Sequence, residues 1–165
     1  MASRGVLYAL SDAELQRLLN LPSDEARIDY LFEEIEEALF DTDQCAETDK
    51  AWDGIHRALS DGSLSWEGGE APLNAAILGG ESLLSVDDCI FSLKLPQQVV
   101  AVDEALQNLS LTDFSSRYWQ IDASDYGHEL SDEDLEYAWD WLQSVRKLYR
   151  FAATKRLSVL FTVDL

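Results

Sequence analysis

Trp52, Asp53 and His56 are the residues of this sequence whose types and spacing come nearest to a chemical site. On a helix, Asp53 and His56 stand at i, i+3 on one face, where a carboxylate and an imidazole can form a hydrogen-bonded acid–base pair. A nucleophile would also be required, and the sequence has no GxSxG motif or comparable Ser or Cys context. We therefore predict no catalytic residues. We interpret the three as a packed Trp and a satisfied His that hold a helix against residues 72–79, with a ligand pocket as the alternative.

Two acidic segments have some features of calcium loops, but both lack essential ligands. Residues 41–49 have no Gly at the sixth position of the loop. Residues 122–133 have Gly at the sixth position and Glu at the twelfth, but Ser and Tyr stand at the third and fifth, where carboxylates or amides belong. The two His and two Cys show no zinc-ligand spacing, and neither Gly-Gly pair precedes the Lys-Ser/Thr of a phosphate-binding loop. We predict neither a metal nor a cofactor.

The sequence has 32 Asp and Glu residues against 12 Lys and Arg, a formal net charge of −20. Small soluble domains usually carry a net charge of about 2–8 in magnitude, and a large excess destabilises the compact state through self-repulsion. Residues 24–49 and 122–140 hold most of the acid. One interpretation is that the acids of these segments are simply exposed to solvent. The other is that they attract a basic protein, because negative charge complements and steers such a partner. Nucleic acids and anionic membrane surfaces would be repelled.

We expect a basic partner to contact the acids that have no evident structural role. Residues 132–136 are different, because they begin a helix whose C-terminal end is basic, and that order complements the helix macrodipole. An exposed Trp would serve the interface as an aromatic anchor. The predicted partner-binding residues are Asp29, Glu33, Glu36, Glu37, Asp41, Asp43, Trp66, Asp122 and Asp125.

Size and composition predict a single compact domain over residues 1–165. The sequence is 47% hydrophobic and 10% aromatic, whereas acidic chains that stay disordered are typically poor in aromatics. Cys45 and Cys89 lie far apart without a CxxC motif, so we expect both thiols to be reduced. The N-terminal apolar run is too short for a signal peptide, and no run approaches the roughly 18 residues of a membrane span. These features predict a cytoplasmic protein and specify no oligomeric state.

Hydrophobic spacing predicts an α+β fold that is mostly helical, with a small sheet of about three strands. The longest predicted helix, residues 132–156, has apolar side chains on two adjoining stripes, so we place it centrally. The helix after Ser23 has one core stripe formed by Ile28, Leu31, Phe32, Ile35, Ala38 and Leu39. Strands are expected at 5–10, 89–95 and 157–165, and helices after Ser11, Ser23, Asp49 and Ser131, at Pro72 and Pro96, and near 113–119.

Two segments resemble paired motifs of the YfbM-like family of bacterial proteins of unknown function. The first motif is Trp-Asp followed by a hydrophobe and a His, and it matches Trp52, Asp53, Ile55 and His56. The second matches the run PLNAAILGG at residues 72–80. The resemblance implies a small α+β domain over most of the chain and supplies no reaction. The acidic stretches lie outside its pattern.

We predict a non-enzymatic acidic binding protein, since no motif in the sequence defines a reaction. Our first hypothesis is an immunity- or inhibitor-type protein that neutralises a basic effector or toxin by masking its cationic site. The alternative is a small-molecule-binding protein or an enzyme of unknown reaction, with a pocket around Trp52, Asp53 and His56. A DNA-mimic protein is a third possibility, which would require carboxylates spaced like phosphates along one extended face.

Overall fold

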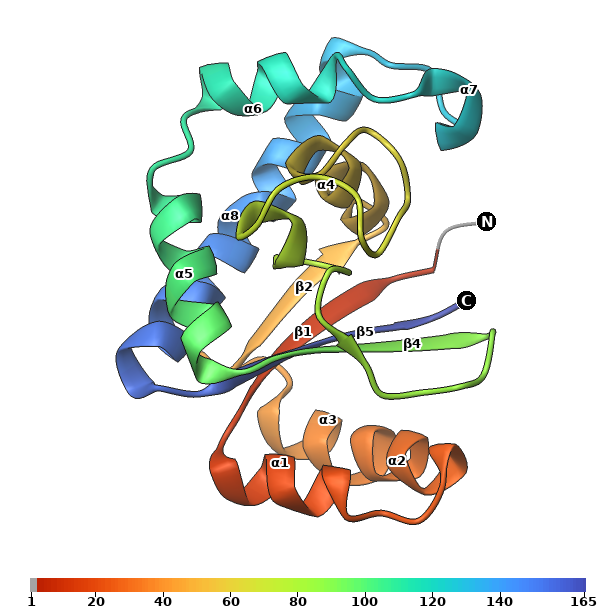
Figure 1. Cartoon of the computed structure of the whole chain (residues 1–165), viewed down its shortest axis with the longest axis vertical. Coiled ribbons are helices and arrows are strands. Elements are labelled where there is room, and N and C mark those ends of the chain that lie inside the picture. Colours follow the sequence, from red (N-terminus) through yellow and green to blue (C-terminus); the bar gives the residue numbers. More distant parts are fainter. Residues whose placement is uncertain (1–2) are drawn as a thin grey trace.

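A five-stranded antiparallel sheet forms the middle layer of the protein, and helices cover both of its faces (Figure 1). The computed structural model describes residues 3–165. The strand order is β2-β1-β5-β4-β3, so the strands at the two ends of the chain pair with each other inside the sheet. The strands are β1 (Gly5–Leu10), β2 (Cys45–Asp49), β3 (Glu81–Ser82), β4 (Cys89–Lys94) and β5 (Ser158–Asp164).

The α+β class and the largely helical content agree with the sequence prediction, but the predicted sheet of about three strands is too small. The three strands that were predicted are β1, β4 and β5. The two that were missed lie at the edges, where β2 pairs with β1 and β3 pairs with β4. Strand β2 turns only Ala46 and Thr48 inward, and β3 has two exposed residues. Neither edge strand therefore has the apolar alternation that identifies a strand from sequence.

A helical segment over residues 12–39 covers one face of the sheet. Its elements are α1 (Asp12–Leu19), α2 (Asp24–Tyr30), the π-helical turn η1 (Leu31–Ile35) and α3 (Glu36–Leu39). Leu31, Ile35 and Leu39 are buried and pack in one cluster with Tyr8 and Leu160 of the sheet. The predicted stripe is wrong for Phe32 and Ala38, which are exposed. The π-turn explains this, because it winds the chain more widely than an α-helix and shifts the phase of the following residues.

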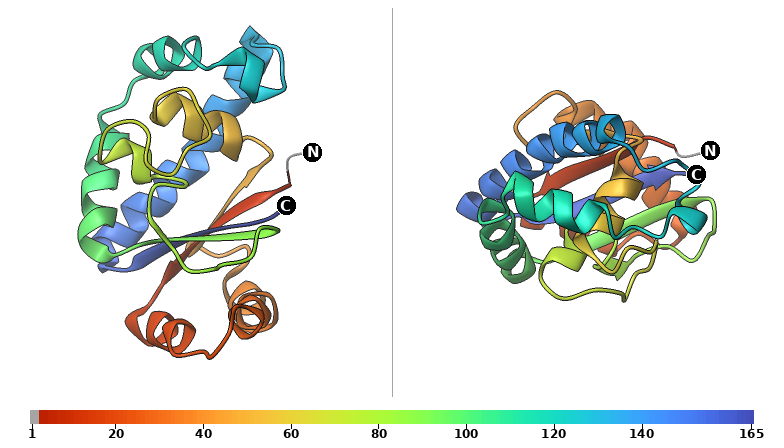
Figure 2. Two further views of the ribbon diagram at one scale, coloured as in Figure 1. Left: turned by 45° about the vertical axis from the view of Figure 1, so that its right-hand side comes forward. Right: turned by 90° about the horizontal axis from the view of Figure 1, so that it is seen from above.

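The opposite face of the sheet carries a larger helical layer (Figure 2). Its elements are α4 (Trp52–Leu59), the 3-10 turn η2 (Leu73–Ala75), α5 (Pro96–Gln107), α6 (Leu111–Tyr118), α7 (Ala123–Tyr126) and α8 (Asp132–Lys155). The long helix α8 contacts β1, β2, α4 and α5, which confirms its predicted central position. Neither α8 nor any other helix among residues 3–165 has both the length and the apolar character that crossing a membrane requires.

Predicted capping residues begin most of these helices. The side chains of Ser11, Ser23 and Ser131 accept backbone N–H bonds at the starts of α1, α2 and α8. The prediction that Asp49 caps α4 is wrong. Asp49 has a positive φ of 48° and its carboxylate accepts a hydrogen bond from the Tyr137 hydroxyl at 2.7 Å, so it ties the end of β2 to α8 instead.

Candidate functional site

His56, the imidazole of the predicted site, is completely buried in α4. Its Nε2 lies 2.6 Å from the carbonyl oxygen of Ser65, and its Nδ1 lies 3.5 Å from the backbone nitrogen of Leu78. Because a carbonyl only accepts and an N–H only donates, these partners assign the neutral tautomer with the proton on Nε2. Burial lowers the pKa of His56 below its ordinary value; the charge of Lys94 acts in the same direction and the Ser65 hydrogen bond opposes it. His56 thus fastens α4 to two loops.

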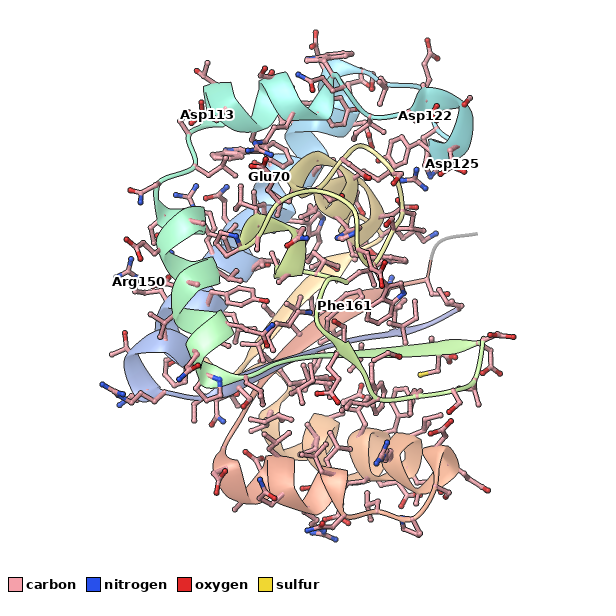
Figure 3. The ribbon with its side chains drawn as sticks, in the orientation of Figure 1. Glu70, Asp113, Asp122, Asp125, Arg150 and Phe161 are labelled. Carbon is pink, nitrogen blue, oxygen red and sulfur yellow. The ribbon has the colours of Figure 1, made fainter. Side chains whose placement is uncertain are left out.

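The expected hydrogen bond between Asp53 and His56 does not form. The Asp53 carboxylate accepts from Arg57 Nε at 2.5 Å, and both ring nitrogens of His56 face backbone groups. Trp52 is also occupied structurally, because its indole N–H donates to the Ser3 carbonyl at 2.7 Å and its ring packs against Phe161 of β5, labelled in Figure 3. The structure therefore brings the three residues onto one helix without joining them into an acid–base pair.

Arg57 replaces His56 as the charged partner in this part of α4. Its side chain is 3% exposed and bridges two carboxylates, with Nε 2.5 Å from Asp53 Oδ1 and Nη1 2.7 Å from Asp125 Oδ2. The guanidinium carbon also lies 5.5 Å from the ring centroid of Tyr126, whose hydroxyl donates to Asp134 at 2.9 Å. Arg57 consequently ties α4 to α7, and through Tyr126 to the first turn of α8.

Lys94 in β4 is a buried polar residue that the sequence analysis missed. Its side chain is fully buried, and its ammonium group donates to the carbonyl of Ile77, to the carbonyl of Ser92 at 3.3 Å and to Ser92 Oγ at 2.9 Å. No carboxylate of residues 3–165 forms an ion pair with it. Burial lowers the pKa of Lys94 well below its ordinary value. The only sequence signal was a lysine inside an apolar strand-like run.

Polar side chains hold residues 76–80, the second half of the PLNAAILGG motif. The Tyr149 hydroxyl donates to the Ala76 carbonyl at 2.7 Å, and Ser92 Oγ donates to the Leu78 carbonyl at 2.9 Å. With His56 and Lys94, four side chains from α4, β4 and α8 converge on this irregular buried segment. The two family-like motifs therefore meet in the core, where His56 of the first is bonded to the backbone of the second.

Acids of the first stretch cover the outside of α2, η1, α3 and the turn that follows α3. All of the predicted ones are exposed except Glu36, which is half-buried. None of these six carboxylates forms an ion pair with any of residues 3–165. We call this surface the acidic face, and its residues are Asp29, Glu33, Glu36, Glu37, Asp41 and Asp43.

Acids of the second stretch lie at the other end of the molecule. Figure 3 shows Asp122 and Asp125 beside α7, whereas Figure 1 shows α2 and α3 at the opposite end of the long axis. Asp122 caps α7, accepting the N–H of Ser124 at 3.1 Å and its hydroxyl at 2.6 Å. Asp125 pairs with Arg57. The two predicted acidic groups therefore form separate surfaces, and these two residues have structural partners.

Trp66, the predicted aromatic anchor, lies apart from both acidic groups. It is half-buried in the loop between α4 and η2. It borders a groove of about 780 Å³ whose other walls include Asn74, Gly80, Ser85 and Asp87. This groove gives a ligand room on the outer side of residues 72–80.

The two calcium-like segments have other structures. Half of the first is strand β2, and the second begins with helix α7. Gly127 ends α7 in the left-handed conformation with a φ of 76°. Within residues 3–165, no three His, Cys, Asp or Glu side chains are grouped so as to hold a metal ion.

Replacing His56 by Ala should destabilise the protein by about 2–4 kcal/mol, because two backbone groups lose their partner and a cavity replaces the imidazole. The matched control is His128→Ala, which removes an exposed imidazole and should change the free energy of unfolding by less than about 0.5 kcal/mol. Urea unfolding followed by tryptophan fluorescence measures both changes. Equal stability of the two variants would contradict the structural role of His56.

The stability difference between wild type and His56→Ala should shrink as the pH falls from 7 to 5. Because the pKa of His56 is lowered in the folded state, the unfolded chain binds more protons around its ordinary pKa of 6.5, and wild type loses stability as the pH falls through that value. The variant has no imidazole at this position and lacks that loss. Urea titrations at several pH values measure the difference, and one that does not vary with pH would contradict burial of a neutral His56.

Replacing Arg57 by Met should lower the free energy of unfolding by about 1–3 kcal/mol, because the Asp53 carboxylate, which is 16% exposed, loses its partner, whereas solvent weakens the bond to Asp125, which is 61% exposed. Arg17→Met is the control, since Arg17 and Glu34 form a pair whose side chains are 58% and 49% exposed. Exposed pairs contribute about 0–1 kcal/mol. Thermal and urea unfolding give the two values, and a larger loss for Arg17→Met would refute the assigned role of Arg57.

Comparisons with known proteins agree with the motifs and with the fold. A family model described as a domain of unknown function (DUF1877) matches residues 1–162. Among solved structures, the chain is similar to the protein of unknown function YfbM from Escherichia coli, with a TM-score of 0.65 and 21% sequence identity over 97% of this chain and 99% of that chain. A search of curated proteins gives no match. The resemblance to the YfbM-like family is confirmed, and the chain belongs to the DUF1877 family.

Proposed function

We propose that this protein is a non-enzymatic binding protein of the immunity or inhibitor type, which neutralises a basic effector by covering its cationic site. The observation that carries the proposal is the acidic face, whose six carboxylates form no ion pair within residues 3–165. Carboxylates placed in this way repel one another and destabilise the free protein. A cationic surface would relieve that repulsion, and the field of the acidic face would steer it into contact.

The proposal is limited to one end of the molecule. Asp122 and Asp125 lie at the other end with partners of their own, and Trp66 lies at the separate groove. Acid divided between two ends also gives little support to a DNA mimic, which needs one extended row of carboxylates. Of the predicted partner-binding residues, those of the acidic face therefore supply the surface that the proposed partner would contact.

A cytoplasmic location is part of the same proposal. Cys45 and Cys89 are free thiols, and burial is the largest cause that raises the pKa of each to about 11. Thiols of this kind stay protonated and react slowly. They suit a protein that acts in a reducing compartment, where it would protect the cell from a toxin made there.

Co-production with a basic protein encoded beside it should give a complex that survives purification at about 50 mM NaCl and weakens strongly at about 500 mM, because salt screens contacts between exposed charges. The variant Asp29→Asn/Glu33→Gln/Glu37→Gln should lose most of the affinity. Asp132→Asn/Glu133→Gln/Glu136→Gln makes the same change in charge at the other end of the molecule and should retain it. Calorimetric titration measures both; equal losses, or an affinity that ignores salt, would contradict the proposal.

One observation favours the alternative of a small-molecule-binding protein or an enzyme. The groove at Trp66 is about 780 Å³ in volume, within the range of ligand pockets. Its walls include Gly79 and Gly80 of the second motif, whereas Trp52 and His56 are buried and do not line it. A ligand would therefore meet the outer surface of the motif and not the Trp52, Asp53 and His56 side chains.

A further inference from the structure

A small hollow beside the acidic face deepens the proposed function and rests on it. The hollow has a volume of about 290 Å³ and lies between the helical segment η1–α3 and the strands β1, β2 and β5. Three kinds of group converge on it: exposed aromatic rings, carboxylates outside any ion pair and the hydroxyl of a core tyrosine. These groups come from elements distant in sequence, so the fold assembles them.

Two phenylalanines form the outer walls of the hollow. Phe32 on η1 is 45% exposed and Phe40 after α3 is 46% exposed. Aromatic residues, Phe included, are enriched at protein interfaces relative to the rest of the surface. Their flat faces also suit a cation, which the ring quadrupole attracts.

The charged groups of the hollow are mostly negative. Glu36 of α3, Glu47 of β2 and Asp164 of β5 all line it, and none of them is in an ion pair within residues 3–165. Arg4 also reaches the hollow, but its guanidinium lies 3.2 Å from Asp49, which does not line it. The hollow therefore keeps an excess of negative charge that an entering cation would neutralise.

Tyr8 lines the inner wall of the hollow. The residue is 2% exposed, and its hydroxyl borders the hollow without a hydrogen bond to any group of residues 3–165. Burial, together with the charges of Cys45, Glu36 and Glu47, raises its pKa, so the hydroxyl stays neutral and able to accept a hydrogen bond. Because this hydroxyl faces the hollow, it is free to accept a hydrogen bond from a bound donor.

We propose that this hollow receives an arginine side chain of the basic partner protein. A guanidinium is planar, so it can stack on Phe32 or Phe40 while its N–H groups donate to Glu36, Glu47 and the Tyr8 hydroxyl. Its five donors match a site with several acceptors, and charge-assisted bonds of this kind are the strong ones. A lysine ammonium is a point charge that cannot stack in the same way. The small volume accommodates one side chain.

The test uses three blocked pentapeptides, Gly-Gly-X-Gly-Gly with X as arginine, lysine or citrulline, titrated into the isotopically labelled protein and followed by amide NMR. The arginine peptide should shift signals around the hollow, including Val6, Tyr8 and Phe32, and the citrulline peptide, which is neutral but of nearly the same shape, should not. Lysine should bind at least about threefold more weakly than arginine. Equal shifts with citrulline, or shifts spread over the whole acidic face, would overturn the proposal. Signals that move on dilution of the protein alone would assign the hollow to a second copy and overturn it as well.

Matched variants separate this inference from the proposed function. Glu36→Gln and Glu33→Gln each remove one charge from the same helical segment, but only Glu36 lines the hollow. Glu36→Gln and Phe32→Ala should each weaken the arginine peptide by about tenfold, and Glu33→Gln by less than about twofold. Tyr8→Phe should fold normally and weaken binding, since no internal bond is lost.

If a basic protein binds in a salt-dependent way but Glu36→Gln and Glu33→Gln weaken it equally, the hollow is refuted and the proposed function stands. If the arginine peptide binds in the hollow but the basic protein encoded beside this chain is not retained, the proposed function is refuted and the hollow stands as an arginine-binding site.

Discussion

Satisfying the backbone of residues 76–80 is the constraint on which the rest of the fold depends. These residues are buried up to Leu78, but they belong to no strand and to no long helix, so their carbonyl and N–H groups have no regular partners. A buried backbone group without a partner costs about as much as a lost hydrogen bond, and several in a row would unfold a small domain. Local backbone bonds pair the N–H groups of Ala76, Gly79 and Gly80. The other partners are side chains: His56 on α4, Ser92 and Lys94 on β4, and Tyr149 on α8. Each of these elements must therefore be held within hydrogen-bond distance of one segment, which fixes the layer above the sheet.

This constraint also explains a lysine that is buried without a carboxylate in a protein so rich in acid. A carboxylate beside Lys94 would itself have to leave water, and the cost of burying two ions often exceeds their attraction. The carbonyls of Ile77 and Ser92 are present in any case and need a donor. Burial lowers the pKa of both Lys94 and His56, because the core disfavours their charged forms, and both side chains supply N–H donors to backbone carbonyls. Phe161 lies 5.8 Å away from the amine and gives it a polarisable wall.

The sequence predicts the parts of this arrangement that depend on local signals. Caps, the central helix and the buried strands follow from capping side chains and long apolar patterns. The edge strands, the exposure of Phe32 and the role of Arg57 do not, because each depends on a tertiary contact. On its helix, Asp53 has two possible partners, His56 at i+3 and Arg57 at i+4. Arg57 forms the pair, and Asp125, which is distant in sequence, binds the same guanidinium and completes a bridge. The donors to residues 76–80 are equally invisible, since Lys94 and Tyr149 reach that segment only once the layers have packed.

The carboxylates at the two ends of the molecule differ in whether they have partners, so the net charge of −20 has more than one explanation. At the α7 end, Asp122 and Asp125 cap a helix and neutralise a buried arginine, so removing them would damage the fold. On the acidic face, carboxylates have no such partners and stand beside exposed aromatic rings. Long-range charge accelerates association and rejects anionic partners, but it orients a partner poorly and is screened by salt. Aromatic surface in a hollow supplies the short-range contact that lengthens the life of a complex. The acidic face combines both, so charge and shape point to the same end of the molecule for the proposed basic partner.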